Sequence, residues 1–289
     1  MDRKEELLNT FEFDYKFERL YPIYSDFEIY EFLKSDFQGL YLQGRIFTQA
    51  DLITWSFKEA DLKQAIFKDT NLIQISFENA NLEKAIFQGV NFLQSNFKNA
   101  NFSQTTFEEV SFLEANLMYA NFSKARINNT NFSRANLVRA KLTNSTLLGK
   151  CIFHQAFLIK ADLNYANFQG AYLTEANLTM MTALGTDFQN ADFTGACIKQ
   201  IACDDQTNLS EVVCRYIYLE PLNDLPITIN FQETSEFLIR LRLVITTLKI
   251  NIEQGYDEVE KILNLLENLL EYHNQSRLER KMNRFTLSS

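Results

Sequence analysis

The fold of this chain is decided by a stretch such as residues 80–104, which reads ANLEK AIFQG VNFLQ SNFKN ANFSQ. Each group of five opens on a small residue, follows it in most groups with Asn, and has Leu or Phe in third place. The large apolar residue recurs at every fifth position without a break from Phe37 to Leu142. The repeated unit is therefore Ala-(Asn/Asp)-(Leu/Phe)-x-x, and its first and third positions are the candidates for burial.

A period of five fits neither a helix nor a flat strand. On an α-helix five residues advance about 140° past a full turn, so the large side chains would spread around the cylinder. In a flat strand an odd step sends them to alternate faces. A chain that turns the same way after every five residues buries all of them on one side. Four such sides close a coil of about 20 residues, which predicts a solenoid.

The twenty-residue step is visible independently of the five-residue step, because like residues recur at that distance. Stacking of identical side chains on successive coils favours such an arrangement. We therefore predict a structural core ladder made of two walls of phenylalanine. Its members are Phe37, Phe57, Phe77 and Phe97 on one wall, and Phe47, Phe67, Phe87 and Phe107 on another.

The register slips once within the repeat. After Leu142 it moves by one residue, somewhere in Thr143–Lys150, and then resumes from Phe153 to Ile198. A single extra residue at a corner predicts a bulge, and Gly149 could supply the unusual backbone angles there.

The pattern is met through nearly the whole of residues 35–203, and it resembles that of the pentapeptide-repeat family. The resemblance implies a β-solenoid, namely a right-handed quadrilateral β-helix. Because a stack of coils leaves an open apolar edge at each end, we expect caps on both sides of it. We assign residues 1–34 to an N-terminal cap, 204–232 to a capping segment and linker, and 233–289 to a C-terminal α-helical hairpin and tail.

The C-terminal region changes to helical periodicity. Apolar residues at steps of three and four predict helices at about residues 234–252 and 256–272, with Gly255 between them as a C-cap. These helices either pack on each other and on the end of the solenoid or dock a partner or second copy in a homodimer, and both can hold at once. The candidate residues for partner or dimer contacts are Leu241, Leu248, Ile252, Val259, Ile262, Leu266 and Leu269.

The sequence predicts no catalytic, cofactor-binding or metal-binding residues, and therefore no cofactor and no enzyme activity. The four cysteines show no Cys-x-x-Cys spacing, and the two histidines, His154 and His273, lie far apart. Only eight glycines occur in the chain, which leaves little room for a phosphate-binding loop.

Charge and hydropathy limit the environment of the protein. The N-terminus lacks the layout of a signal peptide, and no run approaches the roughly 18 apolar residues of a membrane span. We therefore expect a cytoplasmic protein without membrane contact. The net charge of −9 argues against direct nucleic-acid binding, which needs a basic surface.

These observations favour a non-enzymatic structural or interaction scaffold, which presents solenoid walls and C-terminal helices to a protein partner that the sequence does not identify. The resemblance also implies an alternative: a DNA-mimicking protein that binds and protects a topoisomerase (gyrase), as quinolone-resistance proteins do. Residues 35–203 carry 14 acidic and 14 basic side chains. Duplex DNA carries one negative charge per ~1.7 Å, so a neutral solenoid favours the scaffold.

Overall fold

The computed structural model describes residues 13–14, 37–48, 52, 55–204, 206–218 and 227–228. All of them belong to one compact unit, Met1–Leu238. Apart from residues 13–14, the N-terminal cap assigned to residues 1–34 lies outside the described residues, and so do the C-terminal helices predicted within 233–289.

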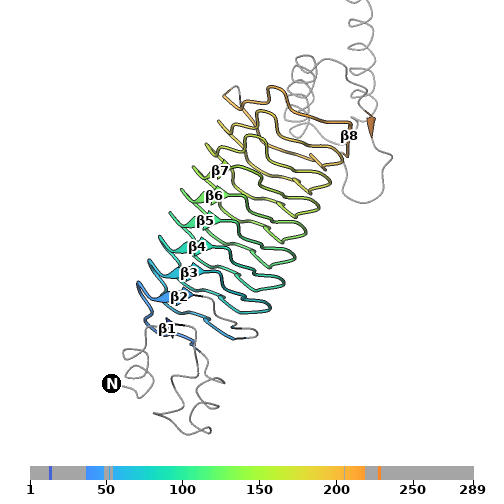
Figure 1. The fold of residues 1–289 in the computed structure, drawn as a ribbon. Coiled ribbons are helices and arrows are strands. Elements are labelled where there is room, and N and C mark those ends of the chain that lie inside the picture. The colour runs from blue at the N-terminus through green and yellow to red at the C-terminus, as the bar shows by residue number, and fades with distance from the viewer. Residues whose placement is uncertain are drawn as a thin grey trace, which may run out of the picture. The chain divides into compact units, whose positions relative to one another are not determined.

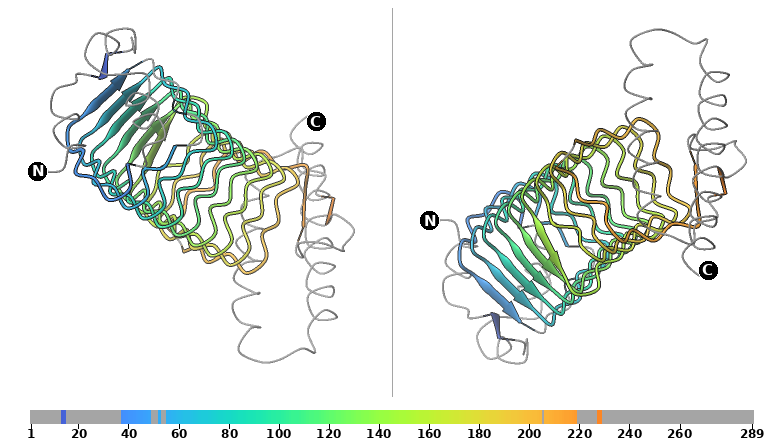
Figure 2. Two further views of the ribbon diagram at one scale, coloured as in Figure 1. Left: turned by 90° about the horizontal axis from the view of Figure 1, so that it is seen from below. Right: turned by 90° about the horizontal axis from the view of Figure 1, so that it is seen from above.

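Parallel strands stacked on one another confirm the predicted β-solenoid (Figure 1). Strands β2 to β6 each pair with the strand twenty residues later, so that Phe47 lies opposite Phe67, and Phe67 opposite Phe87. Figure 2 shows these strands side by side along one side of the coils. The sheet consists of β1 (Phe13–Asp14), β2 (Ile46–Thr48), β3 (Ile66–Lys68), β4 (Ile86–Gln88), β5 (Thr106–Glu108), β6 (Arg126–Asn128) and β7 (Thr146–Leu148).

Each coil has four walls. We number them from the buried residues Phe57 (wall 1), Leu62 (wall 2), Phe67 (wall 3, with β2 to β7) and Leu72 (wall 4). Single parallel bridges with the same twenty-residue step connect the coils on walls 1, 2 and 4. Examples are Ser56 with Ser76, Asp61 with Asn81, and Asn71 with Asn91.

Asparagine in the second place of the unit connects neighbouring coils. On wall 2 the side-chain amide of Asn101 donates to Oδ1 of Asn81 at 3.1 Å, and Asn121 donates to Asn101 at 3.2 Å. The Oδ1 atom of Asn101 also accepts the backbone N–H of Ser103 at 3.1 Å. The Asn101 side chain thus makes hydrogen bonds both within its own coil and to neighbouring coils, which explains why the repeat uses this residue type.

The corners need a left-handed backbone. At most corners the chain closes a turn, as when the N–H of Ala60 donates to the carbonyl of Phe57 at 3.1 Å. The residue two places after the buried centre has a positive φ, near +60° for Glu59. Among the described residues 25 that are not glycine adopt such angles, at a cost of about 1–2 kcal/mol each. Seven of the eight glycines of the chain occupy this same position.

The predicted register slip lies at a corner of the coil. Asn121 bridges Lys141 twenty residues later, but Asn131 bridges Ile152 at a step of twenty-one. The extra residue therefore falls between Thr146 and Ile152, where Gly149 has a φ of 60°. Strand β7 is the last strand of the sheet, and beyond it wall 3 continues as single bridges, such as that between Thr146 and Asn167.

A second extra residue lies beyond the expected end of the repeat at Cys203. Thr182 bridges Ala202 at a step of twenty, whereas Asp187 bridges Asn208 at a step of twenty-one. The bridges continue as far as Tyr218, after which β8 (Tyr216–Ile217) pairs antiparallel with β9 (Ile227–Thr228). The sequence pattern alone did not reveal this continuation.

Asp204 stabilises the second slip. Its Oδ1 atom accepts the backbone N–H of Gly185 at 2.8 Å and lies 2.9 Å from the hydroxyl of Thr207. The hydrogen bond from Gly185 is the main reason why the pKa of Asp204 lies below its ordinary value. The Asp204 carboxylate thus accepts a backbone N–H of the preceding coil at the slip.

The interior is filled by stacked rings. All eight phenylalanines of the predicted ladder are buried. Phe57 and Phe77 stack on one wall with ring centroids 5.0 Å apart and planes 5° apart, and Phe47 and Phe67 stack on another at 4.6 Å. Rings of neighbouring walls meet edge to face, as Phe57 and Phe67 do at 88°. Both geometries are favourable for aromatic pairs.

Two buried serines in the first place of the unit differ in their hydrogen bonds and provide a stability test. The hydroxyl of Ser145 has no hydrogen-bond partner among the described residues. The hydroxyl of Ser95 donates to the carbonyl of Leu72 at 2.7 Å and accepts the N–H of Ile75 at 3.2 Å. At most corners the equivalent N–H and carbonyl bond directly to each other. Here the Ser95 hydroxyl lies between them and links the N–H of Ile75 to the carbonyl of Leu72.

We expect Ser145→Ala to raise the free energy of unfolding by about 1 kcal/mol, because it removes an unsatisfied buried hydroxyl. Ser95→Ala should lower it by about 1–3 kcal/mol, because two buried backbone groups lose their partner. Urea unfolding followed by circular dichroism measures both. Equal losses for the two variants would contradict the assignment.

Candidate protein-binding surface on wall 1

Wall 1 departs from the repeat at Phe157. The same column carries asparagine at Asn96, Asn116, Asn136 and Asn177. The Asn116 amide donates to Oδ1 of Asn96 at 3.0 Å, and this bond helps to hold two coils together. Phe157 cannot make such a bond, and its side chain is 46% exposed. A local rule of the fold is therefore broken in favour of an exposed aromatic ring, which is typical of a functional position.

An apolar column lies beside Phe157. Met118, Val138 and Ile159 occupy the place after the buried centre on successive coils, and each is partly exposed. Backbone bonds join these coils: Tyr119 N–H to Val138 O at 3.0 Å, and Arg139 N–H to Ile159 O at 2.9 Å. We call Met118, Val138, Phe157 and Ile159 the apolar patch.

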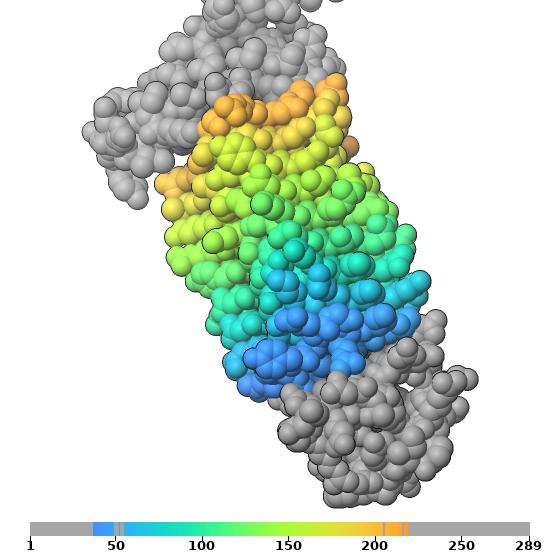
Figure 3. Space-filling view, turned by 90° about the vertical axis from the view of Figure 1, so that its left-hand side faces the viewer, coloured from blue at the N-terminus to red at the C-terminus, as the bar shows by residue number. Residues whose placement is uncertain are grey.

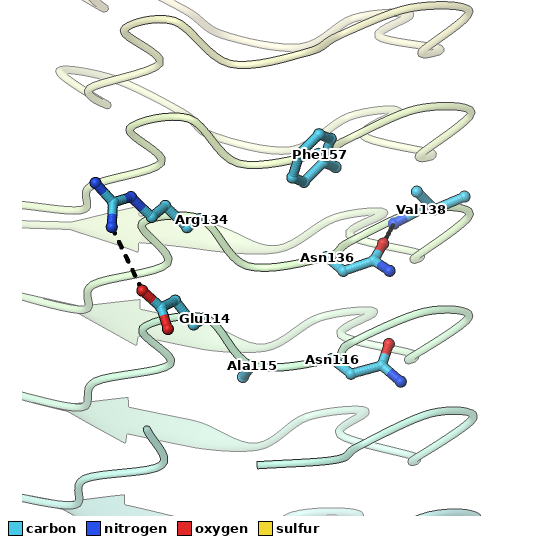
Figure 4. Close-up of a pocket in the computed structure, with 7 residues that line it drawn as sticks. All are labelled: Glu114, Ala115, Asn116, Arg134, Asn136, Val138 and Phe157. Carbon is cyan, nitrogen blue, oxygen red and sulfur yellow. Dashed lines mark hydrogen bonds and ion pairs between the residues drawn. The ribbon is translucent and has the colours of Figure 1, made fainter. Parts of the chain in front are cut away.

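The patch borders a shallow hollow of about 290 Å³. Figure 4 shows Asn116, Asn136 and Phe157 one above another on successive coils, with Glu114 and Arg134 at the side. Figure 3 shows the described coils as closely stacked bands of side chains. The residues that line the hollow are Glu114, Ala115, Asn116, Arg134, Asn136, Val138 and Phe157.

One edge of the patch is a ladder of hydrogen-bonded side chains at the corner between walls 4 and 1. Glu114 accepts from the amide of Gln94 at 2.9 Å and from the guanidinium of Arg134 at 3.4 Å. Arg134 also donates to Gln155 at 3.1 Å, and Gln155 donates to Glu175 at 2.8 Å. Glu114 and Arg134 therefore neutralise each other beside the hollow.

The other edge, at the corner between walls 1 and 2, carries Tyr119, Arg139, Lys160 and Met180. The guanidinium of Arg139 lies 5.6 Å from the Tyr119 ring centroid and donates to its hydroxyl at 3.2 Å. Within the described part of the chain, neither Arg139 nor Lys160 has a carboxylate within 4.0 Å. The edge thus presents two unpaired cations next to the patch, in the sense that Arg139 and Lys160 form no ion pair with a carboxylate of the described residues.

Comparison with protein families assigns the repeat. A family model described as pentapeptide repeat region matches residues 40–117, and one described as pentapeptide repeats (8 copies) matches residues 115–147 and 146–179. The chain belongs to the pentapeptide-repeat family. No curated protein sequence matches this pentapeptide-repeat protein.

Solved pentapeptide-repeat structures resemble it at low identity. HetL of the cyanobacterium Nostoc sp. strain PCC 7120, involved in heterocyst differentiation regulation, is 21% identical over 69% of this chain and 97% of HetL, with a TM-score of 0.46. A trypsin-treated form of QnrB1, a plasmid-mediated fluoroquinolone resistance protein, is 15% identical over 69% and 98%, with a TM-score of 0.49. A pentapeptide-repeat protein from the Arabidopsis thaliana thylakoid lumen is 23% identical over 58% and 72%, with a TM-score of 0.14.

The described part of this pentapeptide-repeat protein contains no group of three or more His, Cys, Asp or Glu side chains that could hold a metal ion. Nor does it contain a helix that is long and apolar enough to cross a membrane. Burial raises the pKa of the Cys151 thiol, which keeps it protonated and unreactive.

The residues predicted from the sequence divide into two groups. The eight ladder phenylalanines lie inside the coils, where they are buried. The seven C-terminal candidates, from Leu241 to Leu269, lie outside the described residues. The apolar patch was missed, although the sequence carries a signal for it: Phe157 stands where the unit has Asn or Asp.

The Glu114 carboxylate makes stability depend on pH. The hydrogen bond from Gln94, and then that from Arg134, lowers its pKa from the ordinary value of 4.5 in the folded protein. Its contribution is therefore present above pH 4.5 and is lost as the pH falls through the lowered pKa. We expect the urea midpoint of Glu114→Gln to fall less steeply on acidification than that of the unmodified protein. Parallel pH profiles would contradict this role.

Proposed function

We propose that this pentapeptide-repeat protein is a non-enzymatic scaffold that holds a protein partner on wall 1. The observation that carries the proposal is the apolar patch, in which a 46% exposed phenylalanine replaces a stack-stabilising asparagine. Aromatic, Met and Arg side chains are enriched at protein interfaces, and a central apolar anchor with a polar rim is the usual layout of a hot spot. The patch, its ladder edge and Arg139 have this composition.

Other parts of the proposal rest on the sequence. The right-handed sense of the coil, the C-terminal helical hairpin at 233–289 and the cytoplasmic location stay predictions. A homodimer through the C-terminal helices stays an alternative use of their apolar residues.

Charge placement favours the scaffold over a DNA-mimicking topoisomerase inhibitor or protector. The outward column of wall 1 reads Lys58, Glu78 and Lys98 before it becomes apolar at Met118. On wall 2, Lys63 and Glu83 form an ion pair at 3.0 Å instead of a row of like charges. A mimic of duplex DNA needs carboxylates at the spacing of phosphates along one surface. No wall of the described residues offers such a row.

Site-specific cross-linking in the cells that produce the protein tests the scaffold. A photo-reactive amino acid at position 138 should yield one dominant adduct with a partner protein, because Val138 lies in the patch. The matched position is Ser103, which holds the same place in the unit on wall 2 and should yield none of it. Loss of the adduct with Phe157→Asn would tie it to the patch. Absence of any adduct specific to position 138 would refute a partner on wall 1.

A chain truncated after Glu220 separates the two possible contact regions. If position 138 gives the same adduct in both chains, the C-terminal helices are not needed for partner contact.

A further inference from the structure

The two unpaired cations lie in register with the apolar patch. Arg139 directly follows Val138, and Lys160 directly follows Ile159. The 2.9 Å bond from Arg139 N–H to Ile159 O places these two pairs on adjacent coils, at a spacing of about 4.8 Å. Two consecutive coils therefore present an apolar side chain on wall 1 and a cation at its edge.

The opposite edge does not cancel this charge locally. Arg134 is satisfied by Glu114 at 3.4 Å, so this pair is neutral. Glu175 accepts from Gln155 and belongs to that far edge of the wall. The unpaired charge adjoining the patch on the wall 2 side is thus positive, although the whole chain has a net charge of −9.

We propose that the segment bound on the apolar patch is acidic. It would be a protein segment that places apolar side chains on Val138, Phe157 and Ile159 and sets carboxylates against Arg139 and Lys160. This inference rests on the proposed function and names the chemistry of the partner. Guanidinium and ammonium groups form charge-assisted hydrogen bonds with carboxylates, and such pairs set the register and orientation of a bound chain.

The number of cations argues for a carboxylate-bearing protein over other anionic partners. Specific nucleic-acid binding commonly uses about 6–10 phosphate contacts, and recognition of anionic lipid uses clusters of about 4–8 basic residues. Arg139 and Lys160 supply two. Between them and the ladder edge lie four partly exposed apolar side chains, which a phosphate backbone would leave uncovered.

Fluorescence anisotropy with the full chain and labelled probes at low salt tests the proposal. The probes are three peptides of about 12 residues and a duplex DNA. The first peptide alternates Glu with Leu and Phe, the second alternates Lys with the same apolar residues, and the third alternates Glu with Ser. We expect the first peptide to bind and the other three probes to bind at least about tenfold more weakly.

Variants locate the binding. The double variant Arg139→Glu with Lys160→Glu should bind the first peptide about tenfold or more weakly than the unmodified protein does. Phe157→Asn, which introduces the residue usual in this column, should weaken binding of the first peptide by a similar factor without loss of stability. The control is Lys124→Glu with Arg126→Glu, the same change of charge away from wall 1, and it should alter the affinity by less than about twofold. Circular dichroism verifies that each variant is folded.

Several outcomes would overturn the inference. These are equal binding of the basic peptide, equal binding of the Glu-Ser peptide, preference for DNA, no binding of any probe, or equal effects of the test and control variants. None of these outcomes decides whether the protein is a scaffold, which the cross-linking experiment at position 138 tests separately. If position 138 still cross-links to a partner, wall 1 binds a protein of different chemistry, whereas loss of that adduct refutes the proposed function.

Discussion

Replacing Phe97 by alanine is expected to lower the free energy of unfolding by about 3–5 kcal/mol, in the range of other buried Phe truncations. Phe97 is buried in the middle of wall 1. Its ring stacks on Phe77 at 5.0 Å and 6°, and meets the edge of Phe92 at 4.8 Å and 85°. Alanine would leave a cavity between two walls, and the neighbouring core side chains cannot close it because their own coils hold them.

Lys98→Ala provides the matched control for Phe97→Ala. Lys98 is the next residue, its side chain points outward, and its backbone carbonyl accepts the N–H of Asn79 at 2.9 Å, which the substitution leaves intact. The change in unfolding free energy should stay within about 0.5 kcal/mol. Urea unfolding at equilibrium measures both variants. A similar loss for the two would mean that Phe97 does not face the interior.

Gly149→Ala is expected to lower the free energy of unfolding by about 2–3 kcal/mol. One part of the cost is the positive φ of 60°. The other part is steric, because a Cβ atom at this position would meet the side-chain oxygens of Asn129 and Asn128. Neither oxygen is free to move: Asn129 accepts the N–H of Lys150 at 2.9 Å, and the Asn128 amide donates to Glu108 at 2.7 Å.

Gly170→Ala separates the two parts of that cost. Gly170 occupies the same corner one coil later with a φ of 64°, and a Cβ atom there would meet nothing within 4 Å. It should therefore lose only the backbone contribution, about 1 kcal/mol. The difference between the two midpoints in urea reports the steric part at the register slip. If Gly170→Ala were the more damaging change, the slip would not be packed as described.

The period of five made the interior predictable. Burial acts on the first and third places of every unit, so the same physical demand is repeated many times and leaves a strong pattern. The slip at Gly149 was visible for the same reason, since it displaces a long series of centres from Phe153 onward. The second slip, near Asp204, was not visible, because too few units follow it before Tyr218 to establish a new register.

The candidate site could not be predicted in the same way. The outward places of the unit are free to vary, so the sequence gives no reason to group Val138 with Ile159 until the coil is closed. The cations Arg139 and Lys160 look ordinary in a neutral repeat, and what sets them apart is their place on adjacent coils beside the apolar patch, which only the closed coil reveals. Phe157 was a readable but weak sign, because aromatic rings also hold the second place of the unit at Tyr41 and Tyr172.

The bridges that join residues twenty or twenty-one positions apart have an evolutionary consequence. Each coil rests only on the coils before and after it, so the molecule behaves as a nearly one-dimensional array of interchangeable modules. Duplication or excision of one full module rejoins equivalent positions and keeps every ring column continuous. Genes for such chains can therefore lengthen or shorten in whole modules, while the outward-facing residues of each module diverge to suit new ligands.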